Sequence, residues 1–478
     1  MEGVRGFRGR AAGVTLVGLV LASLVSTGAP SHAATAAAAR PRAEASNRPN
    51  IVLILTDDQR WDSLGEMPAT NARSWRRFNQ SFVVEPMCCP SRASTLTGRI
   101  PTRTGVDTLL NGARLDERKT FATMLHATGY HTVFAGKYLN GYPFGRGNYK
   151  PPGWDKFFAF NRAANYYNYS LAENGKSVHY GIQPDDYSTD VLARKVVGAI
   201  AAAKRDQPLL VEFAPNAPHR AGLLDPTPAP RHIGTCAGTA FPLPANFNAH
   251  DLAGEPSWMA AEQPKSEATV VRMRRATCET LRGVDDAVTA IFEALARTGR
   301  LANTYVVVTS DNGYQFGEHR LLEKGDLYEP SIRVPLLVRG PGVLPGNTAR
   351  LTSNIDLAPT FLDWAHVAPP AGFFDGTSFA ASARGAKVAG PAAVLLRGCR
   401  TGGTPTTGDA ACGGHDSNMG KNWGLRTARF KYVEYPDGYR QLFDLTADPG
   451  EVRNLALNAA YTATMVGLHR QLVALRDG

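Results

Sequence analysis

After residue 33 the sequence contains no run of about 20 apolar residues, which is the length that a membrane-spanning helix requires. It also contains no polybasic stretch, no aromatic motif typical of RNA-binding domains and no internal repeats. Nucleic acid is therefore a poor partner, although the formal net charge is +10. The positive charge fits anionic small molecules or polysaccharides better, and we expect no integral membrane segment.

Cysteine is scarce as well, and its spacing excludes the commonest zinc sites. None of the six cysteines forms the Cys-x-x-Cys pair that such sites usually show. Two are adjacent and cannot readily bond to each other, which leaves an even set, as expected for disulfides in an exported chain. This set is Cys236, Cys278, Cys399 and Cys412. The simplest pairing closes the Gly/Thr-rich loop between the last two and leaves the first two to each other, while the other pairings stay open.

The N-terminal residues have the pattern of a secretory signal peptide. Three arginines precede an apolar run from about Ala11 to Val25, and small residues follow up to Ala33. We therefore expect residues 1–33 to be a signal peptide and the alanine-rich residues 34–47 to be a flexible segment. Without the signal peptide the formal net charge falls to +8. The pattern predicts a secreted protein, extracellular or associated with the cell envelope.

Five short apolar runs, each ending in polar residues or glycine, are typical of strands buried on both faces of a parallel sheet. These runs are Ile51–Leu55, His131–Ala135, Leu209–Ala214, Thr304–Thr309 and Val334–Val338. Because ligands in such folds bind beyond the carboxyl ends of the strands, we expect the polar residues after these runs to meet at one edge of the sheet.

Helical patterns separate the apolar runs, as a doubly wound α/β fold requires. The first helix can be capped by the hydroxyl of Ser188 or Thr189. Helices are expected over 188–204, 268–298 and 356–365.

The amino-acid composition of the sequence changes after the third expected helix. Small residues and a Gly/Thr-rich loop are followed by a hairpin pattern, 430–435 with 440–445, and by a terminal helix over about 459–475. We therefore divide the mature chain into a larger α/β domain, residues 48–375, and a smaller C-terminal α+β subdomain, residues 376–478.

The stretch from Met87 to Gly98 contains the adjacent cysteines. Its Pro-Ser-Arg segment is typical of a turn that leads into a helix, whose unpaired backbone N–H groups would point back at Cys88. A helix start of this kind favours anions. The alternative is that Cys88 and Cys89 are ordinary buried thiols, since free cysteine is among the most buried residue types.

This stretch resembles the signature of the type I sulfatases, in which the first residue is oxidised to a formylglycine aldehyde: Cys88-x-Pro90-Ser91-Arg92-x-x-x-Leu96-Thr97-Gly98. The resemblance continues to Leu442–Leu445 and Asp448–Glu451 and so covers nearly the whole mature chain. It implies a fold like that of alkaline phosphatase, with a large, mostly parallel mixed sheet flanked by helices. It also implies that Cys88, not Cys89, is catalytic, and that a formylglycine-generating enzyme is the partner for maturation.

Two pairs of oxygen-bearing side chains follow the first and fourth apolar runs. Asp57-Asp58 and Asp311-Asn312 offer only oxygen ligands, which suits a hard divalent cation rather than zinc or iron. Either pair alone is often just a turn or a helix cap. The resemblance implies that these four residues, with the oxidised Cys88, hold the metal. Calcium is the better prediction, with magnesium as the alternative.

Four cationic residues match the sulfatase pattern. The resemblance implies that Arg92 holds the formylglycine oxygens and that Lys137, His219 and Lys324 bind the sulfate group of the substrate. Taken singly, these three also have simpler interpretations, as a solvated strand end, a hydrogen-bonded loop histidine and a surface charge.

The resemblance also implies how the reaction proceeds. One hydroxyl of the hydrated aldehyde, activated on the metal, attacks sulfur and expels the alcohol, with His219 or Lys324 as proton donor to the leaving oxygen. The other hydroxyl lets the sulfated residue return to the aldehyde by C–O cleavage. Many family members have a histidine where this sequence has Leu139, so the base for the last step is open between Asn140 and another histidine such as His319.

Several segments look most like the N-acetylglucosamine-6-sulfatase branch of the family: 136–140, 151–154, 167–169 and 229–232. They imply 6-O-sulfated N-acetylglucosamine or an aryl sulfate as substrate. Trp154, Tyr166 and Tyr167 are candidates to stack on a sugar, although such aromatic residues are more often part of a core. Two other functions stay open: a phosphodiesterase or phosphonate monoester hydrolase that uses the same site, and a non-enzymatic glycan-binding protein with unmodified Cys88.

Overall fold

The computed structural model describes residues 48–222, 224–249, 259, 262–398 and 421–477. The expected signal peptide (1–33), the expected flexible segment (34–47) and the expected Cys399–Cys412 pair lie outside these residues. Within the described ranges, no helix is long and apolar enough to cross a membrane.

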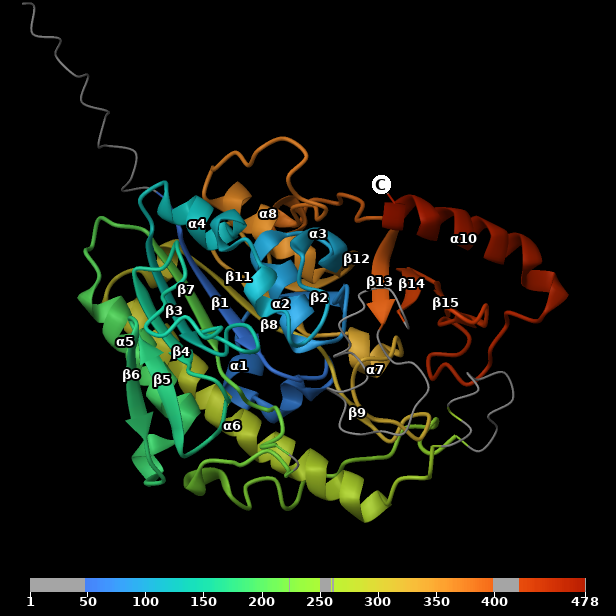
Figure 1. Ribbon diagram of the computed structural model, residues 1–478, viewed down its shortest axis with the longest axis horizontal. Coiled ribbons are helices and arrows are strands. Elements are labelled where there is room, and N and C mark those ends of the chain that lie inside the picture. The colour runs from blue at the N-terminus through green and yellow to red at the C-terminus, as the bar shows by residue number, and fades with distance from the viewer. Residues whose placement is uncertain (1–47, 223, 250–258, 260–261, 399–420, 478) are drawn as a thin grey trace, which may run out of the picture. The chain divides into compact units, whose positions relative to one another are not determined.

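Ten strands form one mixed sheet in the order β12-β2-β11-β8-β1-β7-β3-β4-β5-β6 (Figure 1). The neighbours β8, β1, β7, β3 and β4 run parallel to one another, as do β12 and β2. Strands β11, β5 and β6 run antiparallel to their neighbours. The strands are β1 (Asn50–Thr56), β2 (Arg76–Phe82), β3 (His131–Gly136), β4 (Lys156–Phe160), β5 (Tyr169–Glu173), β6 (Lys176–Tyr180), β7 (Leu209–Ala214), β8 (Thr304–Ser310), β11 (Leu336–Arg339) and β12 (Gly346–Ser353). The predicted large, mostly parallel mixed sheet is confirmed.

Helices cover both faces of this sheet, which explains why every residue of its central strands β1, β7 and β8 is buried. All seven residues of β1 are buried, and successive side chains enter opposite cores. Ile51 and Leu53 pack with residues of α2, α4 and α8, whereas Val52 and Ile54 pack with residues of α5 and α6. The helices on and around the sheet are α1 (Pro68–Asn71), α2 (Cys88–Thr97), α3 (Pro101–Thr104), α4 (Phe121–His126), α5 (Ser188–Ala202), α6 (Glu267–Arg297), α7 (Glu329–Ile332), α8 (Leu357–Trp364) and α9 (Ala380–Ala383).

Four of the five predicted strands are confirmed as β1, β3, β7 and β8. The fifth prediction is wrong about direction. Strand β11 is antiparallel to β8, so its last residue, Arg339, lies at the edge opposite to that of Asp57 and Asp311. An apolar run identifies a buried strand, but it carries no information on which way the strand points.

The predicted helices are confirmed, with ends that shift by a few residues. The predicted cap of α5 is wrong: Tyr187 is the N-cap residue, and Ser188 and Thr189 are buried within the first turn. Helix α6 begins after Ser266, whose side chain accepts a hydrogen bond from the Thr269 N–H.

One disulfide lies among the described residues. It joins Cys236 to Cys278 of α6, with 6.3 Å between the two Cα atoms. This pair, which the simplest sequence pairing predicted, is confirmed. It ties the loop after β7 to α6.

The C-terminal residues form a second, smaller sheet. Its four antiparallel strands are β13 (Ala393–Gly398), β14 (Asn422–Thr427), β15 (Phe430–Glu434) and β16 (Arg440–Asp444). Helix α10 (Thr462–Asp477) packs Leu468 and Leu472 against Leu425 and Tyr432 of this sheet. The predicted hairpin and the α+β character of this part are confirmed, while the division at residue 375 stays a prediction.

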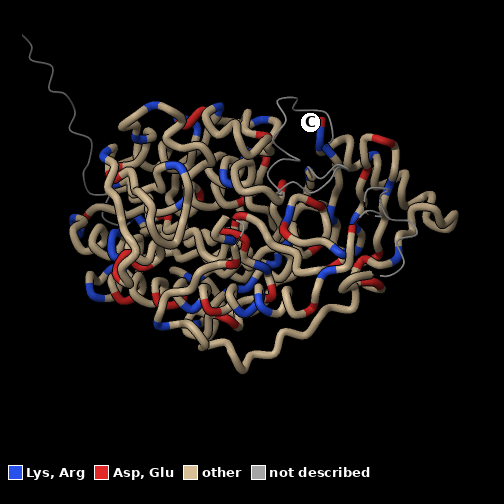
Figure 2. The backbone as a smooth tube through the Cα atoms, turned by 60° about the horizontal axis from the view of Figure 1, so that its bottom comes forward, with Lys and Arg blue, Asp and Glu red and all other residues tan. Residues whose placement is uncertain are grey.

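Acidic and basic residues are both spread along the described chain rather than separated into different parts (Figure 2). The excess of Lys and Arg over Asp and Glu, 52 against 42, is thus not collected in one segment. Buried acids and bases meet instead at the carboxyl ends of β1 and β8.

Candidate active site

The carboxyl ends of β1 and β8 lie side by side and bring four oxygen-bearing side chains together. The last residues of these parallel strands are paired, so the residues that follow meet at the same edge. The Asp58 N–H donates to Asp311 Oδ1 at 3.2 Å, and Asn312 Nδ2 donates to Asp58 Oδ1 at 2.6 Å. All four side chains, including that of Asp57, are buried. Carboxylates so close together need cations to offset their repulsion.

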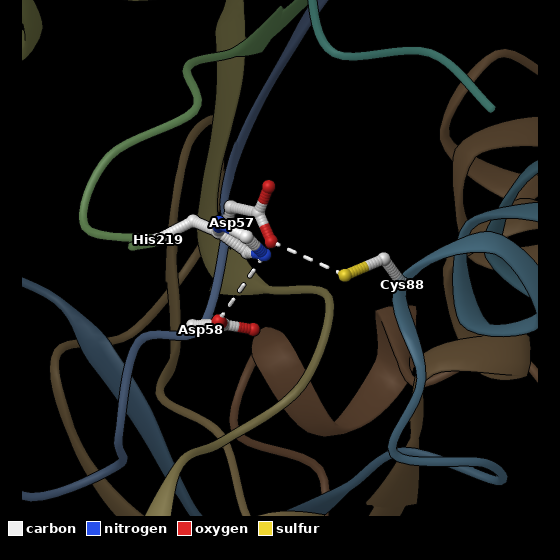
Figure 3. Close-up of side chains that lie close together, drawn as sticks. All are labelled: Asp57, Asp58, Cys88 and His219. Carbon is white, nitrogen blue, oxygen red and sulfur yellow. Dashed lines mark hydrogen bonds and ion pairs between the residues drawn. The ribbon is translucent and has the colours of Figure 1, made fainter. Parts of the chain in front are cut away.

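Helix α2 presents Cys88 to these acids. Cys88 is the first helical residue after Met87, and its Sγ lies 3.4 Å from Asp57 Oδ1 (Figure 3). Asn354 holds the helix start, because its Nδ2 donates to the Ser91 carbonyl at 3.1 Å. Sequence reasoning missed Asn354, since no motif marks it.

Cys89 lies in different surroundings. Both cysteines are buried, as the alternative of ordinary thiols predicted. The Cys89 Sγ lies near Gly112, Leu139 and the Asn140 backbone. Cys88 is the cysteine whose Sγ contacts charged side chains of the cluster, those of Asp57 and Lys324.

Two lysines pair with the carboxylates, and one of them also contacts the cysteine. Lys324 Nζ donates to Cys88 Sγ at 3.0 Å and to Asp58 Oδ1. Lys137 Nζ donates to Asp57 Oδ2 at 2.5 Å. Their side chains are only 8% and 11% exposed, so neither is a solvated strand end or a surface charge.

Arg92 and His219 complete the cluster. Arg92 Nε donates to Asp311 Oδ2 at 2.8 Å, and its Nη1 donates to the Lys137 carbonyl at 2.7 Å. His219 Nε2 lies 3.7 Å from Asp58 Oδ2, and its Nδ1 lies 2.7 Å from the carbonyl oxygen of the next residue. The His219 side chain is 30% exposed and therefore connects the cluster to solvent.

The structure thus brings all the predicted site residues into one contact network. They are Asp57, Asp58, Cys88, Arg92, Lys137, His219, Asp311, Asn312 and Lys324.

Burial and neighbouring charges shift the pKa values of several members. Burial raises the pKa of the Cys88 thiol well above its usual range. Burial also opposes ionisation of Asp57, but the neighbouring cations hold the pKa of this carboxyl well below its usual range. Burial and the charge of Asp57 raise the pKa of Asp311 to about 6. Burial lowers the pKa of His219, which favours the neutral ring.

The donor set fits a hard divalent cation. Asp57, Asp58, Cys88 and His219 each place one possible ligand atom within 4.8 Å of the others. Asn312 Oδ1 is buried and has no hydrogen-bond partner among the described residues. Such an acceptor is costly to leave unsatisfied, and a cation would satisfy it. The abundance of oxygen donors suits calcium or magnesium.

Two residues considered for aldehyde regeneration are held differently. The His319 ring stacks on Tyr328 with 4.0 Å between centroids, and its Nε2 lies 3.2 Å from Asn246 Nδ2. Asn140 follows Leu139 and has a buried Oδ1 with no hydrogen-bond partner among the described residues. The structure therefore places Tyr328 and Asn246 as the groups that position His319.

Two of the three aromatic residues considered for sugar stacking lie in the core instead. Trp154 is 3% exposed, and its ring centroid lies 5.3 Å from that of Phe134. Tyr166 is 2% exposed, stacks on Tyr187 and donates its hydroxyl to a backbone carbonyl of the site at 2.7 Å. Only Tyr167 is partly exposed. Their aromatic character reflects core packing.

Solved structures share this fold. One was determined in complex with its substrate D-glucosamine-2-N,6-O-disulfate; it has a TM-score of 0.74 and 23% identity, and the match covers 90% of this chain and 98% of that one. A phosphonate monoester hydrolase from Silicibacter pomeroyi has a TM-score of 0.70 and 23% identity, with 90% and 95% covered. The protein that binds this disulfated glucosamine and the phosphonate monoester hydrolase thus share one fold with this chain.

Sequence comparison defines the family. Residues 49–367 match the family model described as Sulfatase. The N-acetylglucosamine-6-sulfatase of Capra hircus is 34% identical over 464 residues, which cover 87% of this chain and 81% of the relative. The chain therefore belongs to the sulfatase family, and its activity is that of a sulfuric ester hydrolase.

Proposed function

We propose that this protein hydrolyses a sulfate ester of a saccharide to the alcohol and inorganic sulfate, with residue 88 oxidised to formylglycine. The observation that supports this most is the position of Cys88, whose Sγ lies 3.0 Å from Lys324 Nζ and 3.4 Å from Asp57 Oδ1. The raised pKa keeps this thiol protonated, and a thiol is a poor nucleophile. The hydrate of an aldehyde at the same position supplies oxygen nucleophiles instead.

Asp57, Asp58, Asp311 and Asn312, together with residue 88, would hold a divalent cation. We propose calcium, because several carboxylate and amide oxygens can surround it at once. When bound, the cation would supply positive charge that lowers the pKa of a hydroxyl and offsets negative charge on oxygen.

The cationic side chains would bind the sulfate group of the substrate. Lys137 and Lys324 pair with the carboxylates of Asp57 and Asp58, so their charges would lie where negative charge builds on the sulfuryl oxygens. His219 lies beside Asp58 and would contribute its ring as a hydrogen-bonding group. We also propose His219 or Lys324 as the group that donates a proton to the leaving oxygen. Arg92 would hold residue 88 and the Asp311 carboxylate in place.

We propose 6-O-sulfated N-acetylglucosamine as the substrate class. The relative from Capra hircus is named for this activity, and a structure of the same fold contains a 6-O-sulfated glucosamine. We also propose that the protein is exported and that a formylglycine-generating enzyme acts on it. The Cys236–Cys278 disulfide supports export, because such bonds persist in oxidising compartments.

Two measurements test this function. Rates on 4-nitrophenyl sulfate and on defined sulfated glucosamines should exceed the rates on 4-nitrophenyl phosphate diesters and phosphonates. A strong preference for the phosphorus esters would assign the protein to the alternative, a phosphodiesterase or phosphonate monoester hydrolase. Mass spectrometry of the peptide with residue 88 should show a loss of about 18 Da relative to cysteine. An unmodified peptide from active material would contradict the mechanism, and unmodified, inactive material that binds glycans would support the binding-protein alternative.

A further inference from the structure

Asp58 has a backbone conformation that non-glycine residues rarely adopt. Its φ is +66°, in the left-handed region. Such a conformation persists only where the surrounding structure fixes it. Because the Asp58 carboxylate accepts hydrogen bonds from Asn312 and Lys324, whatever fixes this residue also fixes the geometry of the cluster.

Arg60, two residues after Asp58, is fixed by hydrogen bonds to two carboxylates and by contact with two aromatic rings. Its Nε and Nη2 each donate to Asp62 at 2.9 Å, and its Nη1 donates to Glu318 Oε1 at 2.5 Å. The guanidinium carbon also lies 5.0 Å from the ring centroid of Trp61 and 5.6 Å from that of Phe316. With 7% exposure, Arg60 is a buried cation whose nitrogens are all engaged.

Glu318 belongs to a different part of the chain. It lies between β9 (Gln315–Phe316) and β10 (Leu322–Glu323), and Lys324 follows directly after β10. Its Oε2 accepts a hydrogen bond from the Phe316 N–H at 2.6 Å, which fixes the carboxylate within the hairpin. The Arg60–Glu318 pair therefore joins the loop that carries Asp58 to the hairpin that carries Lys324.

Stability alone is a poor explanation for this pair. Glu318 is 2% exposed, and the cost of removing two charges from water offsets most of the attraction between them. What the pair does provide is a fixed spacing between two loops that come from different strands. Groups that orient metal ligands from outside the ligand set commonly act in this way.

We propose that Arg60 and Glu318 are positioning residues for the cation site. Their ion pair sets the affinity of this site for the cation by holding Asp58 and Lys324 at a fixed spacing. Neither Arg60 nor Glu318 is a ligand of the cation or touches the substrate. The inference rests on the proposed cation site and goes beyond it, because it assigns the affinity of that site to residues outside the ligand set.

Calcium binding measured without turnover tests the proposal. The full chain is stripped with a chelator and titrated with calcium chloride by isothermal titration calorimetry, with all variants in the same state at residue 88. Arg60→Gln should raise the dissociation constant about 10–100-fold, the range usual for such supporting residues. Arg60→Lys keeps the charge but loses the planar set of donors, so its dissociation constant should lie between those of the unsubstituted protein and Arg60→Gln. Glu318→Gln should also raise the dissociation constant.

Arg300→Gln is the matched control. Arg300 is 6% exposed and donates to Asn50 Oδ1 at 3.1 Å and to the Gln207 carbonyl at 2.9 Å, at the amino ends of β1 and β7. Its loss should destabilise the fold but leave the dissociation constant unchanged.

The outcomes separate the two proposals. If the unsubstituted protein binds no calcium, the proposed cation site is wrong. If it binds calcium and the dissociation constant stays the same in Arg60→Gln and Glu318→Gln, the positioning role is wrong. An equal loss in Arg300→Gln would also overturn it, because the effect would then be one of general stability. Should Arg60→Gln not fold, Arg60→Lys and Glu318→Gln decide the question.

Discussion

Lys324 Nζ lies 3.0 Å from Cys88 Sγ, although 236 positions separate the two residues in the sequence. The same ammonium group donates to Asp58, so one buried cation touches both the residue proposed for oxidation and a proposed cation ligand. Burial opposes its charge, but the surrounding anionic groups hold the pKa of Lys324 well above its usual range. A fixed charge of this kind acts most strongly on negative charge that develops during a reaction.

Replacing this charge should mainly affect turnover. Lys324→Met keeps most of the side-chain volume, and we expect kcat on 4-nitrophenyl sulfate to fall about 10²–10³-fold, as for other preorganised electrostatic groups. Lys150→Met, which removes an exposed lysine, should leave kcat unchanged. A loss below tenfold in Lys324→Met, in protein that thermal unfolding shows to be folded, would remove Lys324 from the proposed mechanism.

The two adjacent cysteines should behave differently. Cys88→Ala should abolish turnover without unfolding the protein, because no other residue here supplies the oxidised side chain. Cys89→Ala removes a buried sulfur that packs near Gly112 and Leu139, so it should lower stability by about 1 kcal/mol and retain turnover. Steady-state rates and chemical denaturation of both variants check this. Equal loss of turnover in Cys88→Ala and Cys89→Ala would show that catalysis does not depend specifically on residue 88.

The Cys236–Cys278 disulfide should stabilise the fold. It closes a loop with a sequence separation of 42, and replacing both cysteines by alanine should cost about 2–4 kcal/mol of unfolding free energy. Urea denaturation of both proteins with and without reductant measures this. Reductant should lower the midpoint of the unsubstituted protein more than that of the variant, because the variant keeps only the expected Cys399–Cys412 bond. Equal shifts of the midpoint in both proteins would mean that the Cys236–Cys278 bond contributes nothing.

Much of the site was predictable because its signals are local. An apolar run followed at once by acids marks the ends of β1 and β8, and the spacing after Cys88 marks α2. What escaped prediction depends on contacts between distant residues. Arg60 and Glu318 are 258 positions apart, and neither has a partner that the sequence reveals. The direction of β11 likewise follows from its neighbours in space.

Glu212 of β7 provides a prediction about pH, because burial opposes the ionisation of its carboxyl group. It is 2% exposed, and its Oε2 has no hydrogen-bond partner among the described residues. Burial raises the pKa of Glu212 from its ordinary 4.5 to about 8, although the charge of Arg92 opposes this. Between these values the folded protein binds more protons than the unfolded chain does. The free energy of unfolding should therefore decrease as the pH rises from about 4.5 to about 8, by at most about 1.4 kcal/mol per pH unit from this group.

Glu212→Gln removes that titration while keeping the shape of the side chain. The variant should gain stability relative to the unsubstituted protein as the pH increases, so their urea midpoints should diverge between pH 5 and pH 8. Glu293→Gln, at an exposed position of α6 where the side chain is 62% exposed, is the control and should follow the unsubstituted protein at every pH. Parallel midpoints for Glu212→Gln and the unsubstituted protein across this range would show that Glu212 is already ionised in the folded state, and that a cation or water inside the sheet compensates its charge.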